Sequence, residues 1–507
     1  MTALGAGRYA ARMSTRPERL PADAAPPARD LPRVLGALSA ASILIGAVIG
    51  SGIFQKPSAI AVDLPSPGWI LVCWIAAGAL ALIGSLVFAE LGSRYPQAGG
   101  QYTFIRASFG DLPAFLFGWT NLLVINAAGI AALAFVSAEY LFNLIPVSLR
   151  PAAGSHWFKT VPALLIAALT ATNAAGVRWG AGLQNLLTGL KLAALGLIVA
   201  GLFAPGKTVW PHLGPIWEMR GDPSAAAIRH GFAGAFLATF WAYDGWYQLS
   251  FSGGEIRDPR RNIPLGFVLG IVVVLGVYVA ANIAYFGVLG LDEMSRMGLA
   301  ERAGMPAAHG GVGGFAAFRL FGPAGVTLIS IGIACSTFGA ANASILTGPR
   351  LSFAMARDGL FFRRLGDVHV RWQTPLAAIV VQGGLAVACV YAGSFHQLTD
   401  SAVFAAWIFY LLTILSYFRL RAERHAEGIF RSPGYPVLPA VFVVFAAVFL
   451  VYSLVEAASL AQRYLRNPAD HEAADGLYLI VVVAIILAGV PAYRLLRRGC
   501  GRGANIP

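Results

Sequence analysis

A glycine-rich segment interrupts the first long apolar stretch of the chain. It reads IGAVIGSGIF over residues 45–54, and Gly50 and Gly52 flank Ser51. Unwinding a helix here would free backbone N–H groups at the start of a second half-helix, the end that carries partial positive charge. Such a site suits a carboxylate. Close packing of small residues between membrane helices is an equally good interpretation of these glycines taken alone.

A second interrupted stretch reads TFWAYDGWYQLSFSGGE over residues 239–255, where Gly245 follows Asp244. Carbonyl groups freed at the two breaks would suit an ammonium group, so the pair of breaks matches both charged ends of an α-amino acid. Asp244 could assist that amino group, set the electrostatic potential of a cavity, or cap the second half-helix. The candidate substrate-binding residues are Val48, Ile49, Gly50, Ser51, Gly52, Trp241, Ala242 and Asp244, and Trp241 is the candidate gate.

A lysine lies where a membrane helix should be apolar. Lys191 follows Arg178 by 13 residues, which places it roughly 18–20 Å along a helix and near the middle of the bilayer. A central lysine costs about 2.5–3.5 kcal/mol on insertion, and such residues usually face the bundle interior and have a function. Its ammonium could replace a coupling cation or carry a proton. Tyr278 and Asn342 are polar at similar depth, either supporting the site or forming ordinary bonds between helices.

The elements that carry these residues must be membrane helices. Apolar residues make up 57% of the 507-residue chain and charged residues 12%, against roughly 25% charged residues in soluble proteins. A bilayer-spanning helix needs about 20 apolar residues. Two stretches, 179–206 and 230–254, are interrupted once each, by Lys191 and Asp244. Ten stretches of at least 18 residues contain no charge: 34–55, 64–89, 112–138, 160–177, 262–291, 320–349, 372–399, 401–418, 432–455 and 476–493. We therefore expect an all-α membrane protein with twelve transmembrane helices.

The basic charge indicates the orientation in the membrane. With both termini cytoplasmic, 25 of the 37 Lys and Arg residues lie on the cytoplasmic side and 11 on the other, as the positive-inside rule requires. The net charge of +13 therefore reflects topology, and no nucleic-acid partner is expected. The first 33 residues lack the apolar core of a signal peptide and are expected to form a disordered cytoplasmic tail.

The two breaks fall in the first and sixth spans, at corresponding places of two five-helix halves. Broken helices at such positions are typical of inverted-repeat transporters. The expected segments are a tail (1–33), a first repeat (34–204), an extracytoplasmic loop (205–229), a second repeat (230–422), two further helices (423–498) and a short cytoplasmic tail (499–507). No histidine or cysteine pattern suggests a metal site, so neither a cofactor nor a metal is expected.

Several longer motifs carry a family resemblance. IGAVIGSGIF, FAELGSRYPQAGGQYTF (88–104), FWAYDGW with GEIRDPRRNIPL (254–265), and ILTGPRLSFAMARDGLFF (345–362) are similar to segments of the L-type amino acid transporter family, within the amino acid–polyamine–organocation superfamily. The resemblance covers residues 34–435 and implies the LeuT-type fold, a 5+5 inverted repeat followed by two helices.

The resemblance also implies roles for matching residues. Gly50, Ser51 and Gly52 match the carboxylate-binding loop, and Val48, Trp241, Ala242 and Asp244 lie in the segments that hold the amino group. Lys191 matches a lysine that substitutes for sodium, and Tyr278 a tyrosine that cooperates with it. Animal members join a glycoprotein subunit through a Cys between spans three and four. Residues 145–160 contain no Cys here, so no disulfide-linked heavy subunit is expected and the chain resembles a bacterial-type member.

The sequence therefore predicts a sodium-independent exchanger of neutral amino acids in the plasma (bacterial inner) membrane, working by alternating access. A proton-coupled amino acid symporter is the alternative. A polytopic membrane enzyme or a sensor is more remote, because the loops are mostly short basic linkers without convergent acids or nucleophiles. Small amino acids and membrane lipid are the expected partners.

Overall fold

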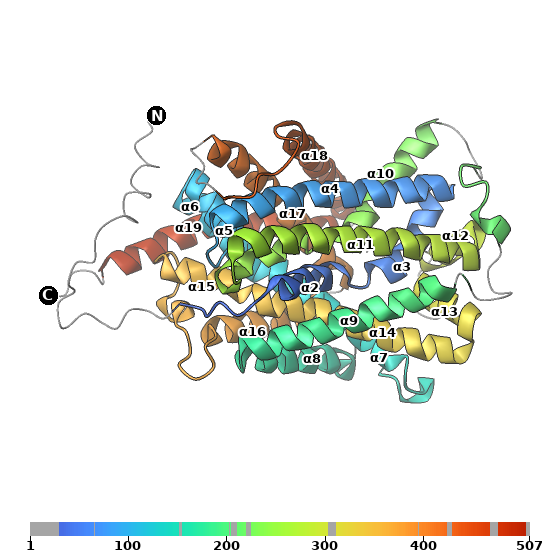
Figure 1. Cartoon of the computed structure of the whole chain (residues 1–507), viewed down its shortest axis with the longest axis horizontal. Helices are drawn as coiled ribbons and strands as arrows, with labels where there is room; N and C mark the ends of the chain where they lie inside the picture. The colour runs from blue at the N-terminus through green and yellow to red at the C-terminus, as the bar shows by residue number, and fades with distance from the viewer. Residues whose placement is uncertain are drawn as a thin grey trace.

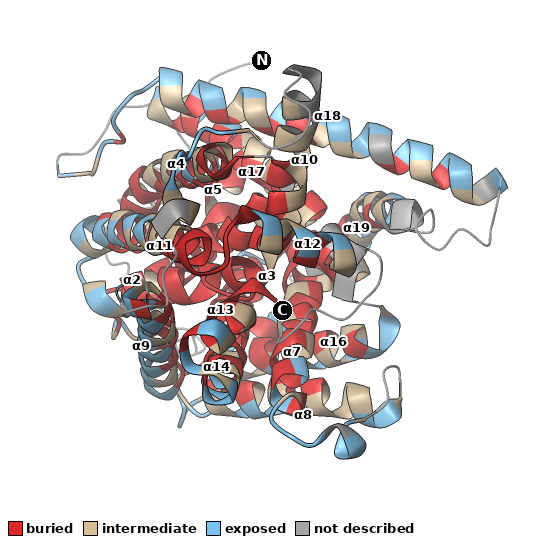
Figure 2. Ribbon diagram, turned by 90° about the vertical axis from the view of Figure 1, so that its right-hand side faces the viewer, coloured by how far each residue is buried: buried red, intermediate tan, exposed pale blue. Residues whose placement is uncertain are grey.

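The computed structural model describes residues 30–64, 66–151, 155–201, 203, 210–219, 225–302, 311–393, 395–422, 428–466 and 475–502. Regular structure in these residues is helical, apart from one bridge between Leu35 and Ile256. Most of the long helices, among them α4 (Pro67–Arg94), α9 (Val177–Gly201) and α11 (Pro259–Leu289), run roughly along the long axis of the molecule (Figure 1), whereas α18 (Val437–Arg466) crosses this direction (Figure 2).

A helix lies in each of the twelve stretches that the sequence marks as apolar. These helices are α2 (Ala37–Val48) with α3 (Gly52–Asp63), α4 (Pro67–Arg94), α6 (Asp111–Thr120) continued through the π-helical turn η1 (Asn121–Ile125) into α7 (Asn126–Phe142), α8 (His156–Ala174), α9 (Val177–Gly201), α10 (Ala225–Tyr243), α11 (Pro259–Leu289), α14 (Pro323–Thr347), α16 (Leu376–Ala392), α17 (Phe395–Arg421), α18 (Val437–Arg466) and α19 (Asp475–Arg502). Shorter elements are α5 (Gln101–Phe109), α12 (Leu291–Arg302), α13 (Val312–Phe321), α15 (Pro349–Arg357), and the 3-10 turns η2 (Val147–Leu149), η3 (Trp210–Leu213), η4 (Trp246–Glu255) and η6 (Arg363–Gly366).

Among the described residues, eight helical segments are long and apolar enough to cross a membrane, and the bent pair α2 and α3 makes a ninth. The count of twelve spans stays a prediction. The boundary between the ninth and tenth apolar stretches differs from the charge pattern. The sequence places this boundary at Asp400, whereas α16 ends at Ala392 and α17 already begins at Phe395. A single charge near a helix end is tolerated because it can reach the polar interface.

The interior of the bundle is apolar, and much of its outer surface is apolar as well. Buried residues fill the centre when the molecule is viewed along the helices, and exposed ones lie around it (Figure 2). Val444, Val448 and Val451 of α18 are all more than 60% exposed. Water would penalise such a surface, whereas lipid tails cover it without cost. The packing therefore agrees with a membrane environment.

Two helices that the sequence analysis did not anticipate lie between α11 and α14. The first of them, α12, packs against α3, and the Ser58 hydroxyl donates a hydrogen bond of 2.8 Å to the Glu301 carboxylate. A Cβ on Gly298 would lie 2.3 Å from the Ser58 carbonyl oxygen, so only glycine allows this close approach. The contact covers α3, the second half of the broken first helix.

The opposite end of the molecule is closed by the N-terminal segment and a buried ion pair. The N–H groups of Val34 and Leu35 donate to the Glu255 carbonyl at 2.9 Å, and Arg257 N–H donates to the Leu35 carbonyl at 2.8 Å. The Arg350 guanidinium holds the Glu255 carboxylate by two bonds of 3.0 and 3.1 Å, with both side chains fully buried. Of the tail predicted over residues 1–33, residues 1–29 lie outside the described part of the chain.

Candidate substrate site

The predicted break in the first helix is present. The helix α2 ends at Val48, α3 begins at Gly52, and their axes differ by 42°. A Cβ on Gly52 would lie 2.6 Å from the Cα of Ala242, so glycine is required at position 52 for α3 to approach α10 this closely. We call residues 49–51 the first break.

A buried cation holds the carbonyl groups of the first break. The Lys191 ammonium donates to the carbonyl oxygens of Gly46 at 2.9 Å and Ile49 at 2.5 Å, and to that of Ser336 on α14 at 2.9 Å. The Ser336 hydroxyl lies 3.0 Å from both the Ile49 and Gly50 carbonyl oxygens. Lys191 is fully buried, and its three N–H donors have three acceptors. This arrangement joins α2, α9 and α14 without a second charged side chain.

The predicted break in the sixth helix is also present, with a different continuation. The helix α10 ends at Tyr243, and the chain then passes through Asp244 and Gly245 into the tight 3-10 helix η4. Gly245 has φ of 95°, a left-handed conformation that favours glycine. A Cβ at this position would also lie 2.9 Å from the Ala47 carbonyl oxygen. We call residues 244–245 the second break.

One tyrosine hydroxyl lies between the two breaks. Tyr278 of α11 places its hydroxyl 2.8 Å from the Ala242 carbonyl oxygen and 3.2 Å from that of Val48. A hydroxyl has a single proton to donate, so these two carbonyl groups share it. The Tyr278 side chain is fully buried, and the bond crosses from α11 to both broken helices.

Asp244 points into a polar environment. Its carboxylate accepts a hydrogen bond of 2.6 Å from the Tyr410 hydroxyl of α17, and the residue keeps partial exposure. A short bond of this kind is typical of a hydroxyl donating to a charged carboxylate. The carboxylate has further lone pairs, so it can also accept a bond from a ligand.

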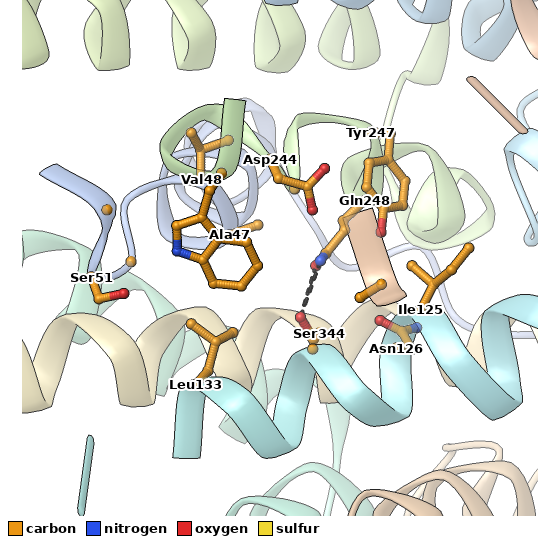
Figure 3. A pocket seen from close by; sticks show the side chains of 16 residues that line it. Ala47, Val48, Ser51, Ile125, Asn126, Leu133, Asp244, Tyr247, Gln248 and Ser344 are labelled. Carbon is orange, nitrogen blue, oxygen red and sulfur yellow. Dashed lines mark hydrogen bonds between the residues drawn. The ribbon is translucent and has the colours of Figure 1, made fainter. Parts of the chain in front are cut away.

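The two breaks enclose a cavity of about 50 Å³. Figure 3 shows Ser51 on one side of it and Asn126, Gln248 and Tyr247 on the other. The cavity has room for a few water molecules and is smaller than an amino acid, so an amino acid can bind there only if its walls separate. Its lining residues are Ala47, Val48, Gly50, Ser51, Gly52, Ile125, Asn126, Gly129, Leu133, Trp241, Asp244, Gly245, Tyr247, Gln248, Ser344 and Ala402.

One end of the cavity offers donors without partners. The Ser51 hydroxyl is buried and has no hydrogen-bond partner among the described residues. Gly52 is the first residue of α3, and the first N–H groups of a helix lack intrahelical acceptors. Buried donors of this kind are normally paired, and their position at a helix N-terminus favours an anionic ligand.

The structure brings most of the predicted site residues together. Val48, Gly50, Ser51, Gly52, Trp241 and Asp244 line the cavity. Ile49 and Ala242 lie beside it, with their carbonyl oxygens bonded to Lys191 and Tyr278. Lys191 does not line the cavity, and its ammonium binds the Ile49 carbonyl oxygen of the first break. Asn342 does not line the cavity and instead bonds to Asn173 and Gln184.

Sequence reasoning missed the polar wall opposite Ser51. Gln248 donates to the Ser344 hydroxyl at 3.1 Å, and Asn126 lines the same end. These are uncharged polar residues within apolar stretches, and that is the signal that could have found them. The chain contains many such residues at membrane depth, however, and their type does not say which of them face a common cavity.

The geometry so far is that of a membrane protein with a small cavity between two broken helices. A model of the amino acid permease family matches residues 35–487. The chain belongs to that family. Family membership makes this permease a transporter rather than an enzyme, and it implies the LeuT-type fold that the broken helices display.

Individual relatives of the permease cover most of its length. It is 32% identical over 430 residues to the b(0,+)-type amino acid transporter 1 of Homo sapiens, covering 84% of this chain and 83% of the relative. It is 32% identical over 417 residues to the serine/threonine exchanger SteT of Bacillus subtilis (strain 168), covering 82% and 89%. It is 30% identical over 476 residues to the large neutral amino acids transporter small subunit 2 of Homo sapiens, covering 92% and 80%.

Proposed function

We propose that the permease is a sodium-independent exchanger of neutral amino acids that works by alternating access. The observation that carries this proposal is the cavity between the breaks, which has donors at one end and acceptors beside them. The carboxylate of the substrate binds the Ser51 hydroxyl and the free N–H groups of α3. Its ammonium binds near the Val48 and Trp241 carbonyl groups, with Asp244 close by.

The surroundings of Lys191 support sodium independence. Backbone carbonyl oxygens are the ligands that unwound transporter helices use to bind sodium, and three of them meet at the Lys191 ammonium. The ammonium supplies the positive charge that a sodium ion would bring. Transport should therefore proceed when sodium is replaced by choline.

The unpartnered donors support exchange rather than net uptake. Closing the cavity around an amino acid pairs the Ser51 hydroxyl and the N-terminus of α3, whereas closing it empty leaves these groups buried without partners. Each such group costs about 1–3 kcal/mol. The loaded carrier therefore crosses between its two open states faster than the empty one, and flux in one direction requires an amino acid on the other side.

The wall opposite Ser51 supports neutral substrates. Asn126 and Gln248 carry uncharged amides, and Asp244 is already bonded to Tyr410. The names of two relatives refer to serine and threonine and to large neutral amino acids. We propose the same broad class here, with Trp241 separating the cavity from one side of the membrane.

The proposal includes the setting of the protein. The basic residues place both termini in the cytoplasm, and the membrane is the plasma (bacterial inner) membrane. Residues 34–204 and 230–422 form the two repeats. Since residues 145–160 lack a cysteine, the permease works without a disulfide-linked heavy subunit.

The test uses the purified full-length chain in proteoliposomes. Uptake of radiolabelled serine and leucine is compared between vesicles loaded with unlabelled serine and empty vesicles, in sodium and in choline buffers. We expect uptake to be many times faster into loaded vesicles and equal in the two buffers. Uptake that ignores the internal amino acid and follows an imposed pH gradient would establish the proton-coupled symporter instead, and sodium-dependent uptake would contradict the role of Lys191.

A further inference from the structure

A buried relay of uncharged polar side chains connects four helices away from the cavity. Asn173 of α8 donates to the Asn342 side-chain oxygen on α14 at 2.8 Å, and Asn342 donates to the Gln184 side-chain oxygen on α9 at 2.9 Å. We call Asn173, Asn342, Gln184 and Thr188 the amide relay. All four side chains are at most 3% exposed.

The relay ends on the backbone of the first half-helix. The Gln184 amide nitrogen lies 3.5 Å from the Ser42 carbonyl oxygen and 3.3 Å from the Thr188 hydroxyl oxygen, and that hydroxyl donates to the Ser42 carbonyl at 3.2 Å. Ser42 already sits inside α2, so its carbonyl accepts these bonds in addition to its helical one. The relay therefore binds α2 to α9, α14 and α8.

The relay binds α2 farther from the first break than Lys191 does. The Ser42 carbonyl belongs to a residue seven positions before the break, about 10 Å along the helix, whereas Lys191 binds the carbonyl groups of Gly46, three residues before the break, and of Ile49 within it. A short helix with a break at one end can rotate about that break, and a contact farther from the pivot opposes this rotation more strongly.

A glycine makes room for the relay. A Cβ on Gly46 would lie 1.6 Å from the Gln184 amide nitrogen and 2.9 Å from the Thr188 hydroxyl oxygen. The amide thus occupies the notch that the missing side chain leaves on α2. This is independent of the hydrogen bonds, and it shows that α2 is shaped to receive the Gln184 side chain.

The chemistry of the relay suits a contact that must open and close. Neutral hydrogen bonds contribute about 0.5–1.5 kcal/mol each, less than bonds to charged groups. When α2 moves away, the amides of the relay need water as a partner. Opening is therefore coupled to entry of water along α2, on the side that we propose to be cytoplasmic.

We propose that Gln184 is a positioning residue for transport, which holds α2 against α9 and α14 in the state closed to the cytoplasm and releases it when the cavity opens to that side. The inference rests on the proposed alternating access. Gln184 contacts neither the cavity nor its lining, so it acts by setting where α2 lies.

The test measures how often α2 moves away from α9 and α14 and exposes position 42. The native cysteines are replaced, and Ser42→Cys, a substitution that keeps the Ser42 carbonyl, is introduced into the full-length chain. Ser42 is 7% exposed, so a maleimide should label this cysteine slowly in the purified protein. Adding Gln184→Leu should raise the labelling rate about tenfold, the expected consequence of losing one or two neutral hydrogen bonds.

Two further variants make the result specific to the relay. Gly46→Ala keeps Gln184 but fills its notch, and it should raise the labelling rate as well. Since both changes break the same contact, the double variant should exceed the larger single effect by less than about twofold. Leu186→Ala is the control, because Leu186 is 59% exposed on the same helix; it should leave labelling unchanged.

The outcomes separate the proposal from its alternatives. Equal labelling of the parent, Gln184→Leu and Gly46→Ala would overturn it, and so would an equal rise in Leu186→Ala. If Gln184→Leu does not fold, Gly46→Ala carries the test, since alanine favours a helix. Labelling requires no transport, so a relay that behaves as expected in a protein that fails to exchange amino acids would disprove the proposed function alone.

Discussion

The two breaks are held by different parts of their residues. At the first break the supporting bonds go to backbone carbonyl groups, from Lys191 and Ser336. Around the second break side chains are bonded as well, because Asp244 accepts from Tyr410 and Gln248 bonds to Ser344, while Tyr278 donates to the Ala242 carbonyl. The first break therefore depends on residues small enough for close backbone packing, and the region of the second break depends also on the chemical identity of its polar side chains.

This difference corresponds to two parts of an amino acid. The carboxylate and ammonium groups are common to all α-amino acids, and backbone groups at the first break can recognise them whatever the substrate. Side chains differ between amino acids, and the varied side chains near the second break face that difference. Changes at the first break and at Asp244 should therefore affect all substrates alike, whereas changes of uncharged side chains in the cavity wall, such as Gln248, should distinguish between them.

The largest effect is expected for Lys191→Ala. The variant loses three bonds from a charged donor, each worth about 1.5–3 kcal/mol, and the first break keeps only the Ser336 hydroxyl as its hydrogen-bonded link to α14. We expect exchange of every amino acid to fall at least about 100-fold, with the protein still monodisperse in gel filtration. Lys159→Ala, at a partly exposed lysine distant in sequence from both breaks, is the control and should retain exchange. Wild-type flux in Lys191→Ala would remove the residue from the mechanism.

Gly52→Ala is expected to have the next largest effect. The added Cβ would lie 2.6 Å from the Ala242 backbone, so the two breaks must move apart. Overpacking of this kind costs about 1–3 kcal/mol, and we expect exchange of serine and leucine to fall by the same factor of roughly 10 to 100. The control is Gly189→Ala, where a Cβ meets open space. A loss confined to one substrate would contradict the assignment of the first break to the common groups.

Asp244→Asn should change affinity more than maximal rate. The amide keeps the size of the side chain and can still accept from Tyr410, but it lacks the charge that attracts an ammonium group. We expect KM to rise about tenfold, equivalent to about 1.4 kcal/mol, and to a similar extent for different amino acids, because all of them carry the ammonium group. Concentration series for serine, alanine and leucine measure this. An unchanged KM for all three would leave Asp244 as a helix cap.

Gln248→Met should have the smallest and most selective effect. Methionine preserves the length of the side chain and removes its hydrogen-bonding groups from the cavity wall. We expect KM for serine to rise about fivefold, as for the loss of one neutral hydrogen bond, while KM for alanine stays the same. Equal changes for the two amino acids would show that Gln248 supports the wall without contacting the substrate side chain.

The sequence was sufficient to place the long helices and both breaks. Bilayer thickness fixes the length of an apolar stretch, and a charge inside such a stretch is costly enough to stand out, as at Lys191 and Asp244. The partners of Lys191 could not be predicted in the same way. They are carbonyl oxygens, which every residue has, and only the path of the backbone brings three of them together.

The cavity wall and the relay were harder to predict. Asn126 and Ser344 lie in stretches that the sequence marks only as apolar, and Gln184 looks no different from the exposed Asn185 beside it. For Asn342 the sequence allows a supporting role at the site or an ordinary bond between helices, and the structure shows it bonded to Gln184 in the relay. Which face of a helix meets its neighbours depends on tertiary packing, and one sequence contains little information about it.

The bridge between Leu35 and Ile256 has a mechanical consequence. The bonds of Val34, Leu35 and Arg257 attach the segment before α2 to the end of η4, so a force applied to this segment is transmitted to the segment that follows the second break. Fusing a bulky protein directly before residue 34 would strain this attachment, whereas a tag at the carboxyl terminus would leave it intact. A load on the amino-terminal segment would therefore act on the segment that follows the second break.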